Sequence, residues 1–473
     1  MKQVNLNEIF GFTCFNIINV QNNLTHSQVA KNNSIHYSRL LTISIVAAMA
    51  GLLFGFDVAI ITGAGPYFTK AFALTNMQEG WAYSSLLFGC IFGAIVAGRL
   101  ADTFGRKIIL YIVAILFALT SVGSGMATNL TWLSLARILG GFAVGAASIT
   151  APMYISEIAP PSKRGSLVSM YQLFIVTGIL ISYLINYLLS GTGDNNWRWM
   201  FATGAIPSVI FFIMLFFIPE SPRYLMKIGK KDIALKGLIE IAGEDEAKQQ
   251  FLEIEKSLHV EKMSFRELLN PSLRKVLWLG FLLAILVQMS GINVVIDYAP
   301  KIFTKAGWNM DTGLFATFGL GLVNFAFTWV SILLIDKYGR RILYIIGSAG
   351  MSISLLGLAI AGFSGHFEGL LVLFLIILFL ASFASSIGPV FWTYISEIFP
   401  NRIRGTAMTI PVFTQWIFNA LAVLVFPAML HQFQLGITFM IIMIFALAQL
   451  VIAIRYMPET KGKSLEEIEE MWR

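Results

Sequence analysis

Long apolar runs separated by short polar stretches make up most of this chain. A helix of about 20 apolar residues crosses a bilayer, and runs of that length recur twelve times. The predicted spans are 40–62, 81–100, 108–127, 131–153, 166–190, 199–218, 275–299, 312–335, 342–362, 369–393, 406–430 and 435–457. This pattern predicts an all-α membrane protein with about twelve transmembrane helices.

One long polar interruption divides the twelve spans into six plus six. It covers Glu220 to Arg274 and is rich in Lys, Glu and Asp at helix-like spacing. We therefore expect the following segments: a tail over 1–37, which is Asn-rich and predicted to be disordered; an N-terminal bundle over 38–219; linker helices over 220–274; a C-terminal bundle over 275–457; and a tail over 458–473.

Composition and charge support a membrane protein. Of 473 residues, 57% are hydrophobic and 12% are charged, whereas a soluble domain is about 25% charged. The net charge of +7 comes from Lys and Arg in loops on one side, so the positive-inside rule predicts that both termini and the linker are cytoplasmic in a cell membrane. Nucleic acid is not an expected partner. Two cysteines and five histidines in no ligand spacing predict no metal site and no cofactor.

The two halves of the chain repeat each other in sequence. The loop that begins at Asp102 and ends at Arg106 recurs at Asp336, the segment around Glu157 recurs around Glu397, and Pro219-Glu220-Ser221 recurs at Pro458, each about 240 residues later. Repeats in the same order and spacing predict two pseudo-symmetric six-helix bundles around a central pathway.

These motifs resemble those of the sugar porters of the major facilitator superfamily. The most specific are the repeated Asp-x-x-Gly-Arg loops, Pro219-Glu-Ser-Pro-Arg223, Gly291-Ile-Asn293, Gly388-Pro-Val-Phe-Trp392 and Pro458-Glu-Thr-Lys-Gly462. The resemblance covers about 38–472 and is nearest to bacterial proton-coupled xylose, arabinose and glucose symporters and to animal facilitative glucose transporters. It implies that the protein imports a monosaccharide (pentose or hexose) or a related polyol with a proton, by alternating access.

Asp57, inside the first span, is the candidate proton carrier. A charged Asp at the centre of a membrane helix costs about 2.5–3.5 kcal/mol, so it faces either a structural partner or a solute pathway. Glycines around it and Pro66 predict that this helix bends or unwinds. Arg137 in the fourth span also needs a partner. The resemblance implies that Arg137 faces Asp57 and that the pair couples transport to protons.

Amide and indole side chains inside apolar spans are the candidate sugar ligands. Amides both donate and accept hydrogen bonds, and an indole offers a stacking face. Each could instead form a bond between helices, but the resemblance implies that together they surround the sugar. The set is Phe54, Gln172, Gln288, Asn293, Asn324, Trp392, Gln415, Trp416 and Asn419.

Acids and arginines at the cytoplasmic helix ends form the predicted gating network. We expect ion pairs there to stabilise the outward-open state and to break as the halves rock; the alternative is charges that only set topology. The set is Arg99, Asp102, Arg106, Glu157, Arg164, Glu220, Arg223, Asp336, Arg340, Glu397, Arg404 and Glu459.

Departures from the family pattern leave the substrate open. Val287 and Ile179 stand where many sugar members carry glutamine, and Asp297-Tyr298 replaces a tyrosine pair at the expected extracellular gate. Asp297 is either a hydrogen-bond partner in that gate or a substrate contact.

Three other functions of a membrane protein are alternatives to proton symport. A uniporter would keep the fold with a structural Asp57, and a sugar sensor would signal through a tail or the linker. A drug/proton antiporter does not fit the Pro219–Arg223 and Gly388–Trp392 motifs. No nucleophile, base and orienting group recur together, so an enzyme is not expected. The expected partners are a sugar, a proton and the lipid bilayer, and the expected state is a monomer.

Overall fold

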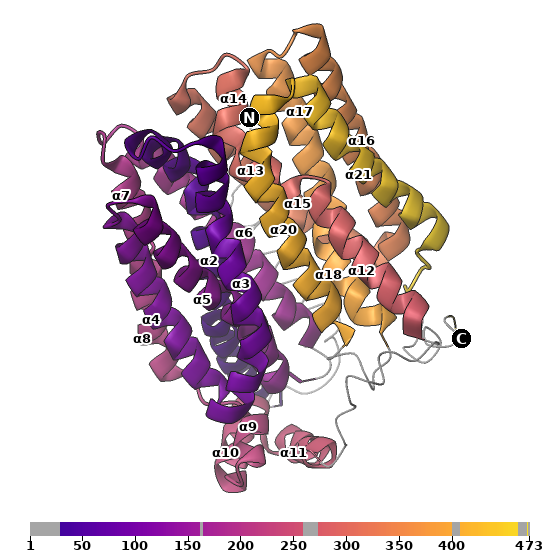
Figure 1. Cartoon of the computed structure of the whole chain (residues 1–473). Coiled ribbons are helices and arrows are strands. Elements are labelled where there is room, and N and C mark those ends of the chain that lie inside the picture. The colour runs from indigo at the N-terminus through magenta and orange to yellow at the C-terminus, as the bar shows by residue number, and fades with distance from the viewer. Residues whose placement is uncertain (1–28, 161–163, 259–272, 400–406, 462–470, 472–473) are drawn as a thin grey trace, which may run out of the picture.

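The computed structural model describes residues 29–160, 164–258, 273–399, 407–461 and 471, and it contains no strand in these ranges. Twelve helical segments of the described residues are long and apolar enough to cross a membrane. The predicted number of spans and the all-α class are therefore confirmed. Figure 1 shows two helical bundles side by side, with the linker helices at one end. We call that end the linker end and the opposite end the gate end.

The N-terminal half contains the first six spans. Its elements are α2 (Val29–Ala71), α3 (Asn76–Phe104), α4 (Arg106–Gly125), α5 (Leu130–Ile158), α6 (Arg164–Leu189), α7 (Asn196–Ala202), α8 (Ala205–Met214) and the 3₁₀ turn η1 (Leu215–Phe217). Because α2 begins at Val29, residues 29–37 of the predicted tail belong to this helix, and residues 1–28 lie outside the described residues.

The linker and the C-terminal half also consist of helices in the residues that the structure describes. The linker forms α9 (Pro222–Lys227), α10 (Lys231–Ala242) and α11 (Glu244–Leu258). The second bundle consists of α12 (Arg274–Met289), α13 (Ile292–Asp297), α14 (Ala299–Lys305), α15 (Met310–Tyr338), α16 (Arg340–Ser364), α17 (Gly369–Ser382), the π-helical turn η4 (Phe383–Ile387), α18 (Gly388–Ile398), α20 (Thr409–Gln432) and α21 (Leu435–Tyr456).

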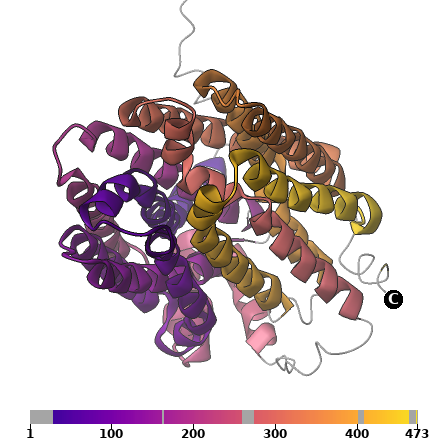
Figure 2. The same cartoon turned by 45° about the horizontal axis from the view of Figure 1, so that its top comes forward.

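The halves pack together mainly through α3 against α20 and α6 against α15, and α2 also contacts α13 and α14. The view in Figure 2 shows α20 lying against the N-terminal bundle. At Gly80 of α3 a side chain would collide with the backbone carbonyl of Leu424 in α20. Small residues let membrane helices approach closely in this way, so the halves are in backbone contact near the gate end.

The first span does not unwind around its glycines, and this part of the prediction is wrong. Helix α2 is continuous through Pro66. Its glycines bring α6 close instead: a side chain at Gly51 would lie 2.6 Å from the Tyr171 carbonyl oxygen, and one at Gly55 would collide with the Ile175 backbone. Breaks occur in other spans: between α7 and α8 in the sixth span, after Met289 in the seventh span, where Gly291 takes a left-handed φ of 85°, and at the π-helical turn η4.

Candidate functional site

Asp57 and Arg137 meet in the interior of the N-terminal half. The Nη1 atom of Arg137 donates to Asp57 Oδ1 at 2.7 Å and to the Asp57 main-chain oxygen at 3.0 Å. Their side chains are 1% (Arg137) and 11% (Asp57) exposed. The ring of Phe201 lies 5.4 Å from the Arg137 guanidinium carbon. A buried charge needs such partners, because breaking a buried pair leaves an uncompensated charge.

Only one of the two Asp57 carboxylate oxygens is hydrogen-bonded to Arg137. The Oδ2 atom of Asp57 is buried and has no hydrogen-bond partner among the described atoms, and the same holds for Nε and Nη2 of Arg137. A side chain at Gly140 of α5 would lie 3.0 Å from Oδ2, so a glycine leaves this oxygen room. The carboxylate can therefore take a proton on Oδ2 with little rearrangement.

Six of the predicted sugar ligands lie on elements that pack against one another: α20 packs against α12 and α13, and α13 also contacts α2. Phe54 of α2 and Trp416 of α20 approach with ring centroids 5.8 Å apart. At the break in the seventh span, Asn293 Nδ2 donates to Gln288 Oε1 at 2.7 Å. The Oε1 atom of Gln415 is buried with no hydrogen-bond partner among the described atoms, and so is a side-chain oxygen one helical turn later, Asn419 Oδ1. Unpaired buried acceptors are costly, and hydroxyl donors of a ligand would satisfy them.

The other three predicted ligands stand apart in the described contacts. Asn324 on α15 is 9% exposed, Gln172 on α6 is partly buried, and Trp392 on α18 is 38% exposed with its ring against Phe391. Among the described residues, no hydrogen bond or ring contact joins these three to Trp416 or Gln288. Their place in the site stays a prediction.

The two halves also meet at the gate end, at Tyr298, which with Asp297 is predicted to form the extracellular gate. The rings of Tyr83 and Tyr298 stack with centroids 4.4 Å apart, and Tyr298 donates its hydroxyl to the Val423 carbonyl at 3.1 Å. Lys301 Nζ binds Glu79 Oε2 at 2.6 Å. The ring stack and the ion pair hold α3 of the first half against Tyr298 and α14 of the second, whereas the hydrogen bond from Tyr298 to Val423 of α20 lies within the second half.

Glu79, Tyr83 and Lys301 are not among the gate residues predicted from the sequence. The predicted second span began at residue 81, which left Glu79 in a loop, whereas α3 begins at Asn76 behind the Thr75–Gln78 capping box. A signal was available in the spacing. Glu79 and Tyr83 are four residues apart, and Tyr298 and Lys301 are three apart, so each pair lies on one helical face.

At the linker end the two halves build the same charge network. In the first half, Arg106 pairs with Glu157 at 2.9 Å and Asp102 at 2.9 Å, and Ser221 donates to Glu157 at 2.5 Å. In the second half, Arg340 pairs with Glu397 at 2.8 Å, and Thr460 donates to Glu397 at 2.6 Å. Each of these contacts lies within one half of the molecule.

The glutamates of the Pro-Glu-Ser and Pro-Glu-Thr motifs cap helices. Glu220 accepts from the backbone N–H groups of Arg106 and Lys107, which begin α4. Glu459 accepts from those of Arg340 and Arg341, which begin α16. A carboxylate is favoured there by the unpaired N–H groups and the helix dipole. Burial nevertheless raises the pKa of Glu220, against the opposing effect of its backbone hydrogen bonds and Arg106.

Replacing Gly105 by alanine should destabilise the fold. Gly105 has φ 101° and ψ 155°, a backbone region that is almost restricted to glycine and costs other residues about 1–3 kcal/mol. A side chain there would also collide with the Glu220 carboxylate. Thermal unfolding in detergent should show a lower Tm for Gly105→Ala. Gly98→Ala is the matched control, because nothing lies within 4 Å of its added carbon; equal shifts for both variants would contradict the capping role.

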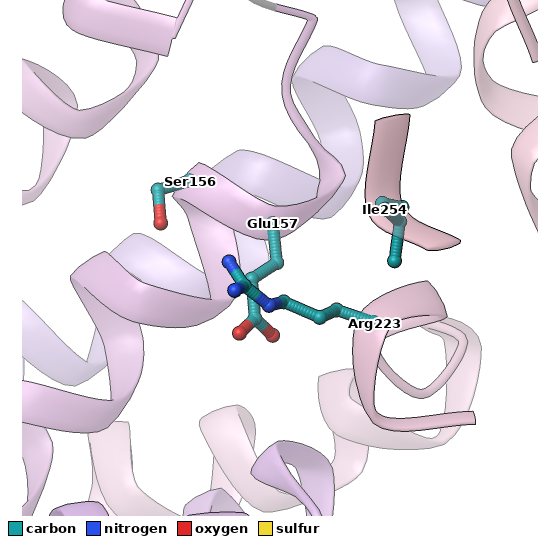
Figure 3. Close-up of a pocket in the computed structure, with 4 residues that line it drawn as sticks. All are labelled: Ser156, Glu157, Arg223 and Ile254. Carbon is teal, nitrogen blue, oxygen red and sulfur yellow. The ribbon is translucent and has the colours of Figure 1, made fainter. Parts of the chain in front are cut away.

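The remaining predicted network residues are exposed or lie outside the described part. Arg99 and Arg223 are exposed. Figure 3 shows Arg223 of α9 reaching towards Glu157 of α5 across a pocket that Ser156 and Ile254 also line. Arg404 lies outside the described residues, and so do the side chains of Arg164 and Asp336.

Comparisons with known proteins cover nearly the whole chain. The family model described as "Sugar (and other) transporter" matches residues 43–472. The arabinose-proton symporter of Bacillus subtilis (strain 168) is 40% identical, covering 94% of this chain and 97% of that protein. The D-xylose-proton symporter of Escherichia coli (strain K12) is 37% identical, covering 93% of this chain and 97% of that protein.

Solved structures agree with these relatives. The inward open conformation of the xylose transporter XylE from E. coli aligns with a TM-score of 0.82 at 35% identity, covering 92% of this chain and all of that one. XylE bound to 6-bromo-6-deoxy-D-glucose, described as a proton:xylose symporter of the major facilitator superfamily, aligns with a TM-score of 0.79 at 36% identity, over 93% and 100% of the two chains. This protein therefore belongs to the sugar transporter family of the major facilitator superfamily.

Proposed function

We propose that this protein imports a monosaccharide together with a proton by alternating access. The observation that carries the proposal is the buried Asp57–Arg137 pair, which offers one unpartnered carboxylate oxygen. Facilitated diffusion needs no such group, whereas uphill transport needs a site that binds and releases a proton. The names of the relatives, arabinose-proton and D-xylose-proton symporters, agree with this function.

The linker end is the cytoplasmic end in this proposal. Arg and Lys concentrate in the loops at that end and in the linker, as the positive-inside rule requires of the cytoplasmic side of a cell membrane. The gate end then faces outward. Because the Tyr83–Tyr298 stack and the Glu79–Lys301 pair join the halves there, the conformation is closed to the outside. We expect the protein to act as a monomer, since one chain supplies both halves of the pathway.

The proton acts through the balance between two conformations. Protonation of Asp57 removes the charge that holds Arg137, and this changes the relative free energies of the outward-facing and inward-facing states. The sugar contributes by binding amides and indoles from both halves, which favours closure around it. At the cytoplasmic ends, the Arg106–Glu157 and Arg340–Glu397 networks support helix ends that would meet across the halves in the outward-facing state.

The substrate we propose is a neutral pentose, hexose or related polyol. The amides and indoles of the candidate ligand set carry no net charge, which suits hydroxyl groups. Val287 and Ile179 are apolar at two positions where amides would add hydrogen bonds. We therefore expect the protein to prefer a sugar that needs fewer hydrogen bonds to its hydroxyl groups than glucose does. For this reason pentoses are tested first.

Uptake into proteoliposomes tests the proposal. The purified protein is reconstituted, and radiolabelled arabinose, xylose, glucose and myo-inositol are supplied with and without an inwardly directed proton gradient. One of these solutes should accumulate above its external concentration only with the gradient. Equilibration without accumulation would identify a uniporter, and no uptake of any of the four would overturn the sugar assignment.

Breaking the Glu79–Lys301 pair should shift the protein towards the outward-facing state. The Glu79 side chain is 4% exposed, so an unpaired carboxylate would cost about 1–3 kcal/mol in the closed gate. We expect Lys301→Gln to lengthen the distance between spin labels at positions 77 and 312, measured by pulsed electron paramagnetic resonance. The charge swap Glu79→Lys with Lys301→Glu should restore the short distance, and exposed Lys305→Gln is the control. An unchanged distance in Lys301→Gln would contradict the role of this pair.

A further inference from the structure

Asp297 is a buried carboxyl group that the proposed mechanism does not use. It ends α13, and the residue is 6% exposed. The contacts of the described residues give it no hydrogen bond and no ion pair. It lies one helical turn after Asn293, so the face that carries Asn293 towards Gln288 continues to Asp297.

The groups around Asp297 come from both halves of the molecule. From the first half, the electrostatic neighbours are Tyr83 on α3, Tyr183 on α6 and Arg137 on α5. From its own half, Tyr298 follows it directly. Asp297 therefore lies where the two halves meet, next to the Tyr83–Tyr298 stack.

The nearby cations are engaged elsewhere. Arg137, whose field reaches Asp297, is hydrogen-bonded to Asp57. Lys301 binds Glu79, which is the other acid of the gate. An ionised Asp297 would therefore be a buried charge with no counter-ion of its own, an arrangement that proteins avoid by neutralising the group.

We propose that Asp297 is a second protonation site, which binds a proton when the extracellular gate closes and releases it when the gate opens. This inference rests on the proposed function. Opening the gate separates Tyr83 from Tyr298 and exposes Asp297 to external water, where a carboxyl group is ionised. Closing the gate removes that water. Before it closes, a proton from the external solution therefore binds a carboxylate oxygen of Asp297.

The direction of the pH effect follows from this linkage. The closed gate binds the proton more tightly than the open gate, so its stability is greatest at low pH and is lost as the pH rises. One linked proton changes the ratio of open to closed gates by up to about tenfold per pH unit. An acidic exterior therefore favours closure and the inward-facing state, which is the direction that import requires.

A distance measurement without sugar or gradient tests the proposal. Spin labels are placed by Met77→Cys and Thr312→Cys, both exposed at the gate end, in the full chain with Cys14 and Cys90 replaced by serine. The protein is reconstituted in lipid nanodiscs, and the label distance is followed from pH 5 to pH 9. In the wild type the open population should rise with pH by up to about tenfold per unit. Asp297→Asn should stay closed throughout.

Three further variants separate the possible outcomes. Asp297→Glu keeps a titrating carboxyl group and should retain the pH dependence, whereas exposed Asp311→Asn should behave as the wild type. Asp57→Asn shows whether the transition belongs to the other acid. If Asp297→Asn titrates like the wild type, or if Asp57→Asn alone abolishes the transition, the proposal is overturned. Because no sugar is transported in this experiment, its outcome does not depend on whether the protein accumulates sugar.

Discussion

Asp57→Asn should abolish uphill sugar uptake while sugar exchange persists. The substitution keeps an oxygen that can accept a hydrogen bond from Arg137, as Oδ1 of Asp57 does at 2.7 Å in the wild type. It removes the carboxyl group that titrates. A membrane potential of 100 mV supplies about 2.3 kcal/mol per charge, which corresponds to about 50-fold accumulation at 1.4 kcal/mol per tenfold. The variant should show no accumulation, because no charge enters with the sugar.

The measurement compares two modes of the same proteoliposomes. Radiolabelled sugar uptake under an imposed proton gradient reports coupling, and counterflow between equal sugar pools reports binding and the conformational cycle. Asp194→Asn, an exposed acid in the α6–α7 loop, is the matched control and should accumulate sugar like the wild type. Accumulation by the Asp57→Asn variant would show that the proton is carried elsewhere. Loss of counterflow as well would show that Asp57 is needed for the conformational cycle itself.

Gln288→Ala and Gln415→Ala should each weaken sugar binding by about 1–3 kcal/mol, or about 5- to 150-fold, because a buried hydrogen bond to a hydroxyl is lost. Gln288 accepts from Asn293 at 2.7 Å, so its removal also releases a second ligand. Gln415 has a buried oxygen with no partner among the described atoms, and a bound hydroxyl is its expected donor.

Binding is measured by isothermal titration calorimetry of the purified protein in detergent. Gln449→Ala is the matched control, because Gln449 is a fully buried amide on α21, which packs against α16 within the second half. It should alter stability without altering affinity. Wild-type affinity in both glutamine variants would place the sugar away from the break at Gly291 and from α20. Equal losses in all three variants would indicate a general effect on the fold.

Asp57 and Arg137 show how far sequence reasoning reaches into the candidate site. Each is a charged residue inside an apolar span, and the cost of such a charge predicts a partner for each. That Asp57 and Arg137 are each other's partners is implied only by the resemblance to the family. The contact at 2.7 Å agrees with it. The same reasoning predicts Asn324, Gln172 and Trp392 as ligands, yet no hydrogen bond or ring contact among the described residues joins them to the rest of the set.

The twelve spans, the two repeated halves and the family can be predicted from the amino-acid pattern alone. Each span depends on the transfer of one apolar segment into a bilayer, which is a local property of about 20 residues, and the motifs are contiguous. The contacts between distant residues, in contrast, follow only from how the helices pack. The Glu79–Lys301 pair joins residues far apart in the chain, and Glu220 and Glu459 cap helices that begin more than 100 residues earlier. The glycines of α2 pack against α6, while the seventh span breaks at Gly291. These outcomes depend on which helix faces meet and at what depth, and the apolar pattern of each span leaves both undetermined.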